Sequence, residues 1–241
     1  MWKSALPVAV AMLFAGAPAL AQEGRLETVT VTASMVDNDE LRAAPAVYRR
    51  IPADFVLTEV TYQSGSRDGA VRKRELSAMF DRLKKEVAKT AGYELQGGEI
   101  GYSSASIDTV AFGDIYFDYN GQAHFTLTLS VDTKPGETFD QLMRRATEFI
   151  GGIKAEGRAE AWLGDEQFIG ARNIGAHRAD LMADIRQEAE HLQTLFQPSS
   201  VTVGGLESRV ITQPSGPLEL EIFIPYTLTV KSVSAGNTGT D

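Results

Sequence analysis

The 241-residue sequence contains no cysteine and only three histidines, His124, His177 and His191. Without cysteine the chain can form no disulfide, no thiolate metal site and no thiol nucleophile, so its stability has to come from packing and hydrogen bonds. Basic residues are also in deficit, because 23 Lys and Arg stand against 32 Asp and Glu and give a formal net charge of −9. Such an acidic chain is poorly suited to bind DNA or anionic lipid through bulk electrostatics, so we expect no nucleic-acid partner.

Long hydrophobic runs are absent too, and a helix that spans a bilayer needs about 20 consecutive apolar residues. The main apolar segment, residues 5–14, follows a single cation at Lys3 and is interrupted by Pro7. An Ala-Leu-Ala sequence ending at Ala21 supplies the small residues that a signal peptidase requires. We therefore expect residues 1–21 to be a secretory signal peptide and not a membrane anchor. The rest of the chain is expected in a bacterial periplasm, free or at the outer membrane, without a transmembrane segment.

Motifs that hold a nucleophile, a phosphate or a catalytic metal are missing, including G-x-G-x-x-G, the P-loop, H-E-x-x-H and G-x-S-x-G. His177 and His191 would lie about 21 Å apart along a helix at 1.5 Å per residue, which is too far to share a metal ion. His124 has only Thr and Ser as polar neighbours on its expected strand, an arrangement that does not suit a catalytic triad.

Asp114 and Asp118 would share one face if residues 112–119 formed a strand, and with the following Gly121 they suggest a calcium loop. Aligning Gly121 with the invariant glycine of that loop places Leu127 where the bidentate glutamate is needed, so the ligand set is incomplete. We expect no catalytic residue, no cofactor and no metal. A hydrolase that uses the two aspartates is the alternative.

Hydrophobic periodicity predicts an α+β fold, with a largely antiparallel sheet and about three helices packed on it. Asn120-Gly121 favours a tight hairpin because both residues tolerate positive φ, and Thr138 with Gln141 forms a capping box that opens a helix. Helices are expected at residues 70–91, 138–150 and 178–196, and strands at residues 28–33, 55–62, 100–119, 122–131, 159–163, 201–203, 209–212 and 218–233.

The expected organisation is one folded domain over residues 22–234. Within it, residues 37–53 are polar and contain proline, which indicates an inserted loop or a tether. The last residues, 235–241, are small and polar, and we expect a disordered tail there.

The order of elements and several local motifs resemble the SIMPL-domain family of bacterial periplasmic and outer-membrane-associated proteins. The matching pieces are the V-T-V-T sequence at 29–32, the Pro-x-x-Phe-Val run at 52–56, Ala91-Gly92 after a lysine-bearing helix, the Phe-x-x-Leu helix after Asp132, and the helix RADLMADIRQEAEHL at 178–192. The chain departs from the family in having no GEG link after its first strand. The resemblance implies a SIMPL-like fold and a non-enzymatic envelope protein, in some members a ring-like oligomer, linked to stress tolerance.

The stretch ETVTVTA, at residues 27–33, allows two interpretations. Its period-two alternation is typical of the first strand of the domain. It also resembles a TonB box, an extended segment that adds to the edge of the sheet of TonB. Under the second interpretation the protein is an accessory of TonB-dependent uptake. The candidate partner-binding residues in this stretch are Glu27, Thr28, Val29, Thr30, Val31, Thr32 and Ala33.

A second candidate contact surface is the aromatic stretch FGDIYFDYNG, in which we single out Phe112, Tyr116 and Tyr119. Packing within a strand is the other explanation for such residues. Taken together, the sequence predicts an envelope protein that acts by binding or by oligomeric assembly, with itself or with another envelope protein, and not by catalysis.

Overall fold

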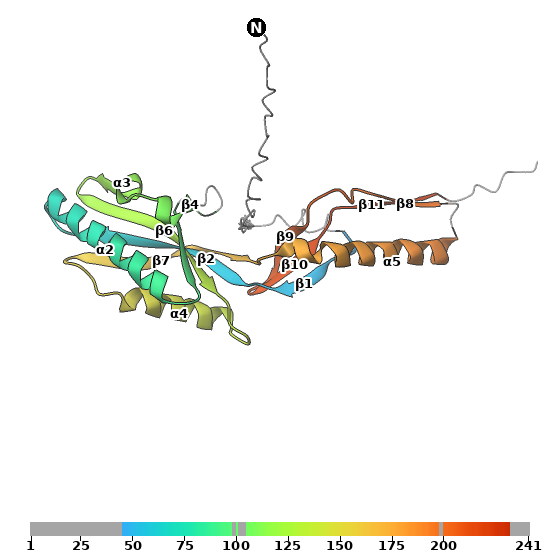
Figure 1. The fold of residues 1–241 in the computed structure, drawn as a ribbon, viewed down its shortest axis with the longest axis horizontal. Coiled ribbons are helices and arrows are strands. Elements are labelled where there is room, and N and C mark those ends of the chain that lie inside the picture. The colour runs from blue at the N-terminus through green and yellow to red at the C-terminus, as the bar shows by residue number, and fades with distance from the viewer. Residues whose placement is uncertain (1–44, 98–99, 101–104, 198–199, 232–241) are drawn as a thin grey trace, which may run out of the picture.

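The structure is a computed structural model that describes residues 45–97, 100, 105–197 and 200–231. It is an α+β fold whose strand pairs are antiparallel, as the sequence predicted. Figure 1 shows two lobes side by side along the longest axis. We call residues 53–173 the central lobe, and the second lobe combines residues 45–52 with residues 174–231.

The central lobe is built on a six-stranded sheet with the order β4-β3-β6-β2-β7, in which β5 also pairs with β6. Strands β2 and β6 lie at its centre and pair over ten residues, from Phe55 opposite Asp132 to Ser64 opposite Ala123. The strands are β2 (Phe55–Ser64), β3 (Tyr93–Gly97), β4 (Ala105–Ser106), β5 (Phe117–Tyr119), β6 (Gln122–Asp132) and β7 (Ala159–Gly170).

Helices α2 (Gly69–Lys89) and α4 (Phe139–Gly152) cover one face of this sheet. Asp68 caps α2 by accepting from the Val71 amide, and the predicted capping box of Thr138 and Gln141 opens α4. The alternation in β6 directs one side of the strand toward the helices, and there Phe125 stacks on Tyr62 with ring centroids 5.1 Å apart. The main core therefore lies between the two helices and this face of the sheet.

The second lobe contains a three-stranded sheet, β1-β10-β9, and a separate two-stranded sheet, β11-β8. Helix α5 packs along both, and its Leu181 and Ile185 form a small core with Ile222 and Ile224. The elements are β1 (Arg49–Pro52), the 3-10 turn η2 (Ile174–His177), α5 (Arg178–Phe196), β8 (Ser200–Gly204), β9 (Ile211–Gly216), β10 (Glu219–Phe223) and β11 (Thr227–Lys231).

The two lobes are joined where β1 runs almost directly into β2. The Ala53 amide donates to the Leu218 carbonyl in the second lobe, and the Asp54 amide donates to the Gly170 carbonyl in the central lobe. Ile51 packs against both cores. Because these backbone hydrogen bonds anchor residues 53 and 54 on both sides, the junction is part of the packed structure.

Three expected elements differ from the structure at their ends or in number. The loop or tether expected at 37–53 includes β1, whose residues Arg49–Pro52 pair with β10. The single strand expected at 218–233 is two strands in different sheets, β10 and β11, because Pro225 between them cannot donate to a ladder. Strand β7 extends to Gly170, seven residues beyond the expected end, and pairs with β2 across an irregularity in register.

The strand expected at residues 100–119 is also wrong for the described part of that range. This part forms β4, the 3-10 turn η1 (Ile107–Thr109), the short helix α3 (Phe112–Ile115) and β5. Strand β3 was not predicted from the sequence at all. The Asn120-Gly121 turn is confirmed, with φ of 51° and 79° at its two residues. Among the described helices, none combines the length and apolar character needed to span a membrane.

Candidate functional site

The part of the structure best suited to contact another protein is a projection that we call the arm, made of α5 with β8 and β11. Figure 1 shows that these elements extend away from the central lobe, beyond β1, β9 and β10. Of the 19 residues of α5, only Leu181 and Ile185 are buried, and both lie in its first half. Among the described residues, the second half of α5 is therefore covered on one side, by β8 and β11.

The antiparallel strands β8 and β11 direct their apolar side chains to one face of the pair. Val201 lies opposite Val230, and Val203 lies opposite Leu228, so all four share a face of the two-stranded sheet. None of the four is fully buried, and the exposed fraction of Val230 is 42%. A two-stranded sheet on one helix does not supply enough layers to close a core at this point.

The tip of the arm exposes large apolar side chains. Leu195 and Phe196, the last two residues of α5, are 61% and 63% exposed, the values expected of surface side chains. Their apolar area remains in contact with water. Burying one such side chain in an interface would stabilise the complex by about 1.5–3 kcal/mol. Phe196 continues the apolar stripe of Leu181 and Ile185 in the sequence, but it is exposed because the core ends before it.

Both strands of the arm also have a free edge, because β8 and β11 pair only with each other among the described strands. Their residues are Ser, Val, Thr, Gly and Leu except for Lys231 at the end of β11. Charges, proline and bulges normally protect an edge strand from pairing with another chain, and this pair has little of that protection. The edges are thus available for strand addition.

Charged residues fix the first half of the arm to its base. The Arg49 guanidinium on β1 donates to both carboxylate oxygens of Asp184, over 2.5 and 3.0 Å, and to Asp180 over 2.9 Å. The hydrogen bond from Arg49 holds the pKa of Asp184 below its usual value. Arg178 donates to the backbone carbonyls of Leu206 and Ser208. The base of the arm is therefore held to β1 and to the loop after β8 by oriented contacts.

The second predicted contact surface, the aromatic stretch, is divided by the fold. Phe112 lies on α3 and Tyr116 follows it, and both side chains are half-buried against the main core. The ring of Phe112 lies 5.8 Å from that of Phe80 and 6.0 Å from that of Phe125. Tyr119 on β5 is 68% exposed, and so is its neighbour Phe117 at 58%. Only the β5 part of the stretch is open to a partner.

Asp114 and Asp118 do not share a strand face, which corrects the geometry assumed for a calcium or hydrolase site. Asp114 accepts from the amide of Ala111 at the start of α3. Asp118 binds Arg72 through two carboxylate oxygens, each 2.9 Å from the guanidinium, and accepts from the Tyr116 hydroxyl. The hydrogen bond from Arg72 lowers the pKa of Asp118, while burial and then Asp118 raise the pKa of Tyr116. The Asp118 carboxylate is thus engaged in holding β5 to α2.

Beside this pair lies a buried carboxylate that the sequence analysis did not single out. Glu75 of α2 is 6% exposed and accepts from the hydroxyls of Ser64 and Ser66 and from the Arg158 amide. Burial alone would raise the pKa of Glu75, but the hydrogen bonds outweigh it and the pKa is lowered. These bonds tie the end of β2 to α2 and to the segment before β7.

The three histidines lie on separate elements. His124 is on β6 beside Phe117, His177 ends η2, and His191 is exposed on α5. Within the residues that the structure describes, no group of three or more His, Cys, Asp or Glu is placed to hold a metal ion. The stretch at residues 27–33 and the predicted signal peptide lie outside the described residues, so both stay predictions.

Comparison of the chain with protein-family models, with curated proteins and with solved structures finds no match.

Proposed function

We propose that this protein is a non-catalytic assembly protein of the bacterial cell envelope, secreted to the periplasm, and that its arm joins one copy to another. The observation that supports the proposal most directly is that the arm does not close a core of its own. Leu195, Phe196 and Val230 are exposed at the end of a projection whose two strands pair only with each other among the described strands. The resemblance to the SIMPL-domain family supports the same role, since some members form ring-like oligomers.

The contact has the chemistry of an interface hot spot. Aromatic and aliphatic side chains that become buried at the centre of a contact provide most of its binding free energy. Pairing of β8 or β11 with the same strand of a second copy would extend the two-stranded sheet to four strands and bring the two α5 helices side by side on one face of it. Such an isologous contact uses the same surface on both copies and closes as a dimer.

Sedimentation velocity of the full chain over a range of concentrations tests the arm. We expect Leu195→Glu with Phe196→Glu to weaken association by about 100-fold or more, because two apolar side chains worth about 1.5–3 kcal/mol each no longer become buried. Ile211→Glu is the matched control, since Ile211 is an exposed apolar residue on β9, outside the arm. A wild-type chain that stays monomeric, or a double variant that associates normally, would contradict the proposal.

The alternative, an accessory protein of TonB-dependent uptake, depends on residues 27–34, which lie outside the described residues. It stays a prediction from the sequence. Deleting residues 27–34 should abolish binding to TonB and leave the far-UV circular dichroism unchanged if that alternative is correct.

A further inference from the structure

Within the part of the chain that the structure describes, one face of the central sheet has no helix on it. Helices α2 and α4 cover the opposite face, where Val60, Tyr62 and Phe125 are buried. The uncovered side chains form a surface that we call the open face. Its residues are Glu59, Thr61, Gln63, Phe117, Tyr119, Gln122, His124, Thr126, Glu160 and Trp162.

Strand register places these side chains in adjacent rows. One row runs from Phe117 through His124 and Gln63 to Glu160. The next row runs from Thr126 through Thr61 to Trp162, and the hydroxyls of the two threonines are 2.9 Å apart. The open face is therefore one continuous surface across four strands.

Aromatic side chains open to solvent stand on β5 at one edge of the open face and on β7 at the other. The exposed fractions are 45% for Trp162, 58% for Phe117 and 68% for Tyr119. The other end of the same sheet face differs, because Phe55, Leu57 and Phe168 are buried there and pack with Ile100. Exposed aromatic residues gathered on one surface are characteristic of protein contacts.

The charge of the open face is of one sign. Glu59 and Glu160 are its charged residues, it contains no Lys or Arg, and within the described residues neither glutamate forms an ion pair. Asp165 and Glu166 add exposed acids at the irregularity in β7 beside it. The complementary partner is a surface that carries cations and can approach aromatic rings.

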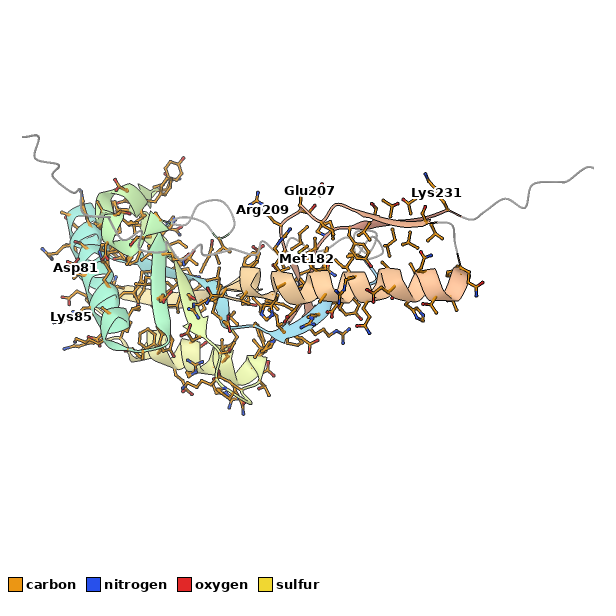
Figure 2. The ribbon with its side chains drawn as sticks, turned by 45° about the vertical axis from the view of Figure 1, so that its right-hand side comes forward. Asp81, Lys85, Met182, Glu207, Arg209 and Lys231 are labelled. Carbon is orange, nitrogen blue, oxygen red and sulfur yellow. The ribbon has the colours of Figure 1, made fainter. Side chains whose placement is uncertain are left out.

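The outer face of α2 has that chemistry. It consists of Ala70, Arg74, Ser77, Asp81, Lys85 and Ala88, spaced by three or four residues along the helix. Lys73 lies beside Arg74 at the edge of this face, with its ammonium 5.8 Å from the ring centroid of Tyr116. Within the described residues, Lys73, Arg74 and Lys85 are exposed and form no ion pair with a carboxylate. Figure 2 shows Asp81 and Lys85 on the side of α2 that points away from the sheet. Small residues between the cations allow a flat surface to come close.

We propose that the open face of one copy packs against the outer face of α2 in the next copy. The inference rests on the proposed role in self-assembly, but it uses the central lobe and not the arm, so the two contacts can fail separately. The two surfaces lie on opposite sides of the same lobe, which makes the contact heterologous and lets it repeat from copy to copy. The lengths agree, at about 17 Å for residues 122–126 of β6 and about 18 Å from Lys73 to Lys85 on α2.

Charge reversal on each surface tests the contact, in a chain that also carries Leu195→Glu and Phe196→Glu to remove the arm. The face variant is Glu59→Lys with Glu160→Lys, and the helix variant is Lys73→Glu with Lys85→Glu. Each variant alone should lose the association that remains after the arm is removed. Light scattering after size exclusion should show at least a 10-fold rise in the concentration needed for association.

Mixing the two variants gives the decisive result. The positive face of one variant then meets the negative helix of the other, and the two unreversed surfaces still match, so an equimolar mixture should recover association. High salt should weaken both the recovered and the original contact. The matched controls are Glu207→Lys and Arg209→Glu, two exposed residues in the loop before β9 (Figure 2), which should change nothing in the same background.

Two outcomes would overturn the inference. The first is association of either variant alone at the level of its background, or no recovery in the mixture. The second is a background chain that stays monomeric but binds an 18-residue amphipathic Lys/Leu peptide at the open face. Trp162 fluorescence reports this binding once Trp2→Phe has removed the other tryptophan. That second result would assign the open face to a basic helix of a different protein. Circular dichroism confirms folding of each variant, and Glu160→Lys alone should show a smaller change in the same direction.

Discussion

Helix α2 of the central lobe and helix α5 of the arm have similar lengths, 21 and 19 residues, but they bury very different surfaces. Seven side chains of α2 are buried and two of α5. The first half of α5 packs on β10, as α2 packs on its sheet, and the described strands beside its second half are β8 and β11. An amphipathic pattern tells which side of a helix faces a core, but it does not tell how far that core extends.

The difference between the two helices suggests that the central lobe provides folding stability and that the arm provides association. The central lobe contains most of the main core, because two helices and six strands surround one apolar cluster, which Leu220 of β10 and Ile174 complete. The arm has part of a core and free strand edges, and its exposed apolar area is the kind that an interface covers. Stability is therefore expected to concentrate in the central lobe and association in the arm.

The largest effect should come from breaking the central core. Phe125 is fully buried, stacks on Tyr62 and meets the edge of Phe80 at 5.9 Å. Phe125→Ala should lower the free energy of unfolding by about 3–5 kcal/mol, through lost burial and the cavity left behind. Leu195→Ala, at the tip of the arm, should change it by no more than about 0.5 kcal/mol.

Urea denaturation of the two alanine variants, below the concentration at which the chain associates, gives both values. If Leu195→Ala cost as much as Phe125→Ala, the tip of the arm would be packed within the monomer, and the contrast between the two regions would be wrong.

The buried carboxylate Glu75 should make the stability of the central lobe depend on pH. Its pKa is lowered in the folded state, so the stability that it contributes is present above its ordinary pKa of 4.5 and is lost as pH falls through the lower folded value. Glu75→Gln should cost about 1–3 kcal/mol at neutral pH, because hydroxyl and amide donors lose a charged acceptor. The same variant should lose less stability than the wild type between neutral and acidic pH.

Thermal unfolding across pH 3–7 measures this difference. Glu190→Gln is the control, because Glu190 is exposed on α5 in the arm. Equal pH dependence for Glu75→Gln and the wild type would show that Glu75 does not carry the acid sensitivity assigned to it.

Local sequence patterns were enough to predict most of the central lobe. The alternation of β6, the stripe of α2 and the capping box of α4 are each determined within a few residues, and the structure confirms all three. The same is true of the bounds of α5 at residues 178–196. These elements are set by periodicity and by side chain–backbone hydrogen bonds, which need no knowledge of distant residues.

Long-range pairing is what the sequence could not predict. Strand β1 is short and polar, and it exists because β10, about 170 residues later, supplies its hydrogen bonds. Residues 112–115 form a helix although the aromatic stretch at 112–119, to which they belong, favours a strand, because Phe112 packs into the core beside Phe80 and Phe125. The exposed tip of the arm was missed for the same reason, since no local pattern shows where the second core ends.

The smallest expected effect comes from the ion pairs that join β1 to α5. Arg49→Gln removes the donor that Asp184 and Asp180 share, on a surface where solvent screens such pairs. The midpoint of global unfolding should therefore move less than in Phe125→Ala or Glu75→Gln. Amide hydrogen exchange should quicken in the first turns of α5 and stay unchanged in β6, because only the attachment of the arm has been loosened.

Asp184 adds a pH dependence of the same sign as Glu75, because its pKa is also lowered in the folded state. The ion pair with Arg49 contributes its full stability above the ordinary pKa of Asp184, and this stability is lost as pH falls through the folded value. Arg186→Gln, which removes an exposed pair within α5, is the matched control and should leave exchange at the base of the arm as it is. Faster exchange in β6 as well would mean that the arm and the central lobe unfold as one unit, and the comparison between them would then describe packing but not stability.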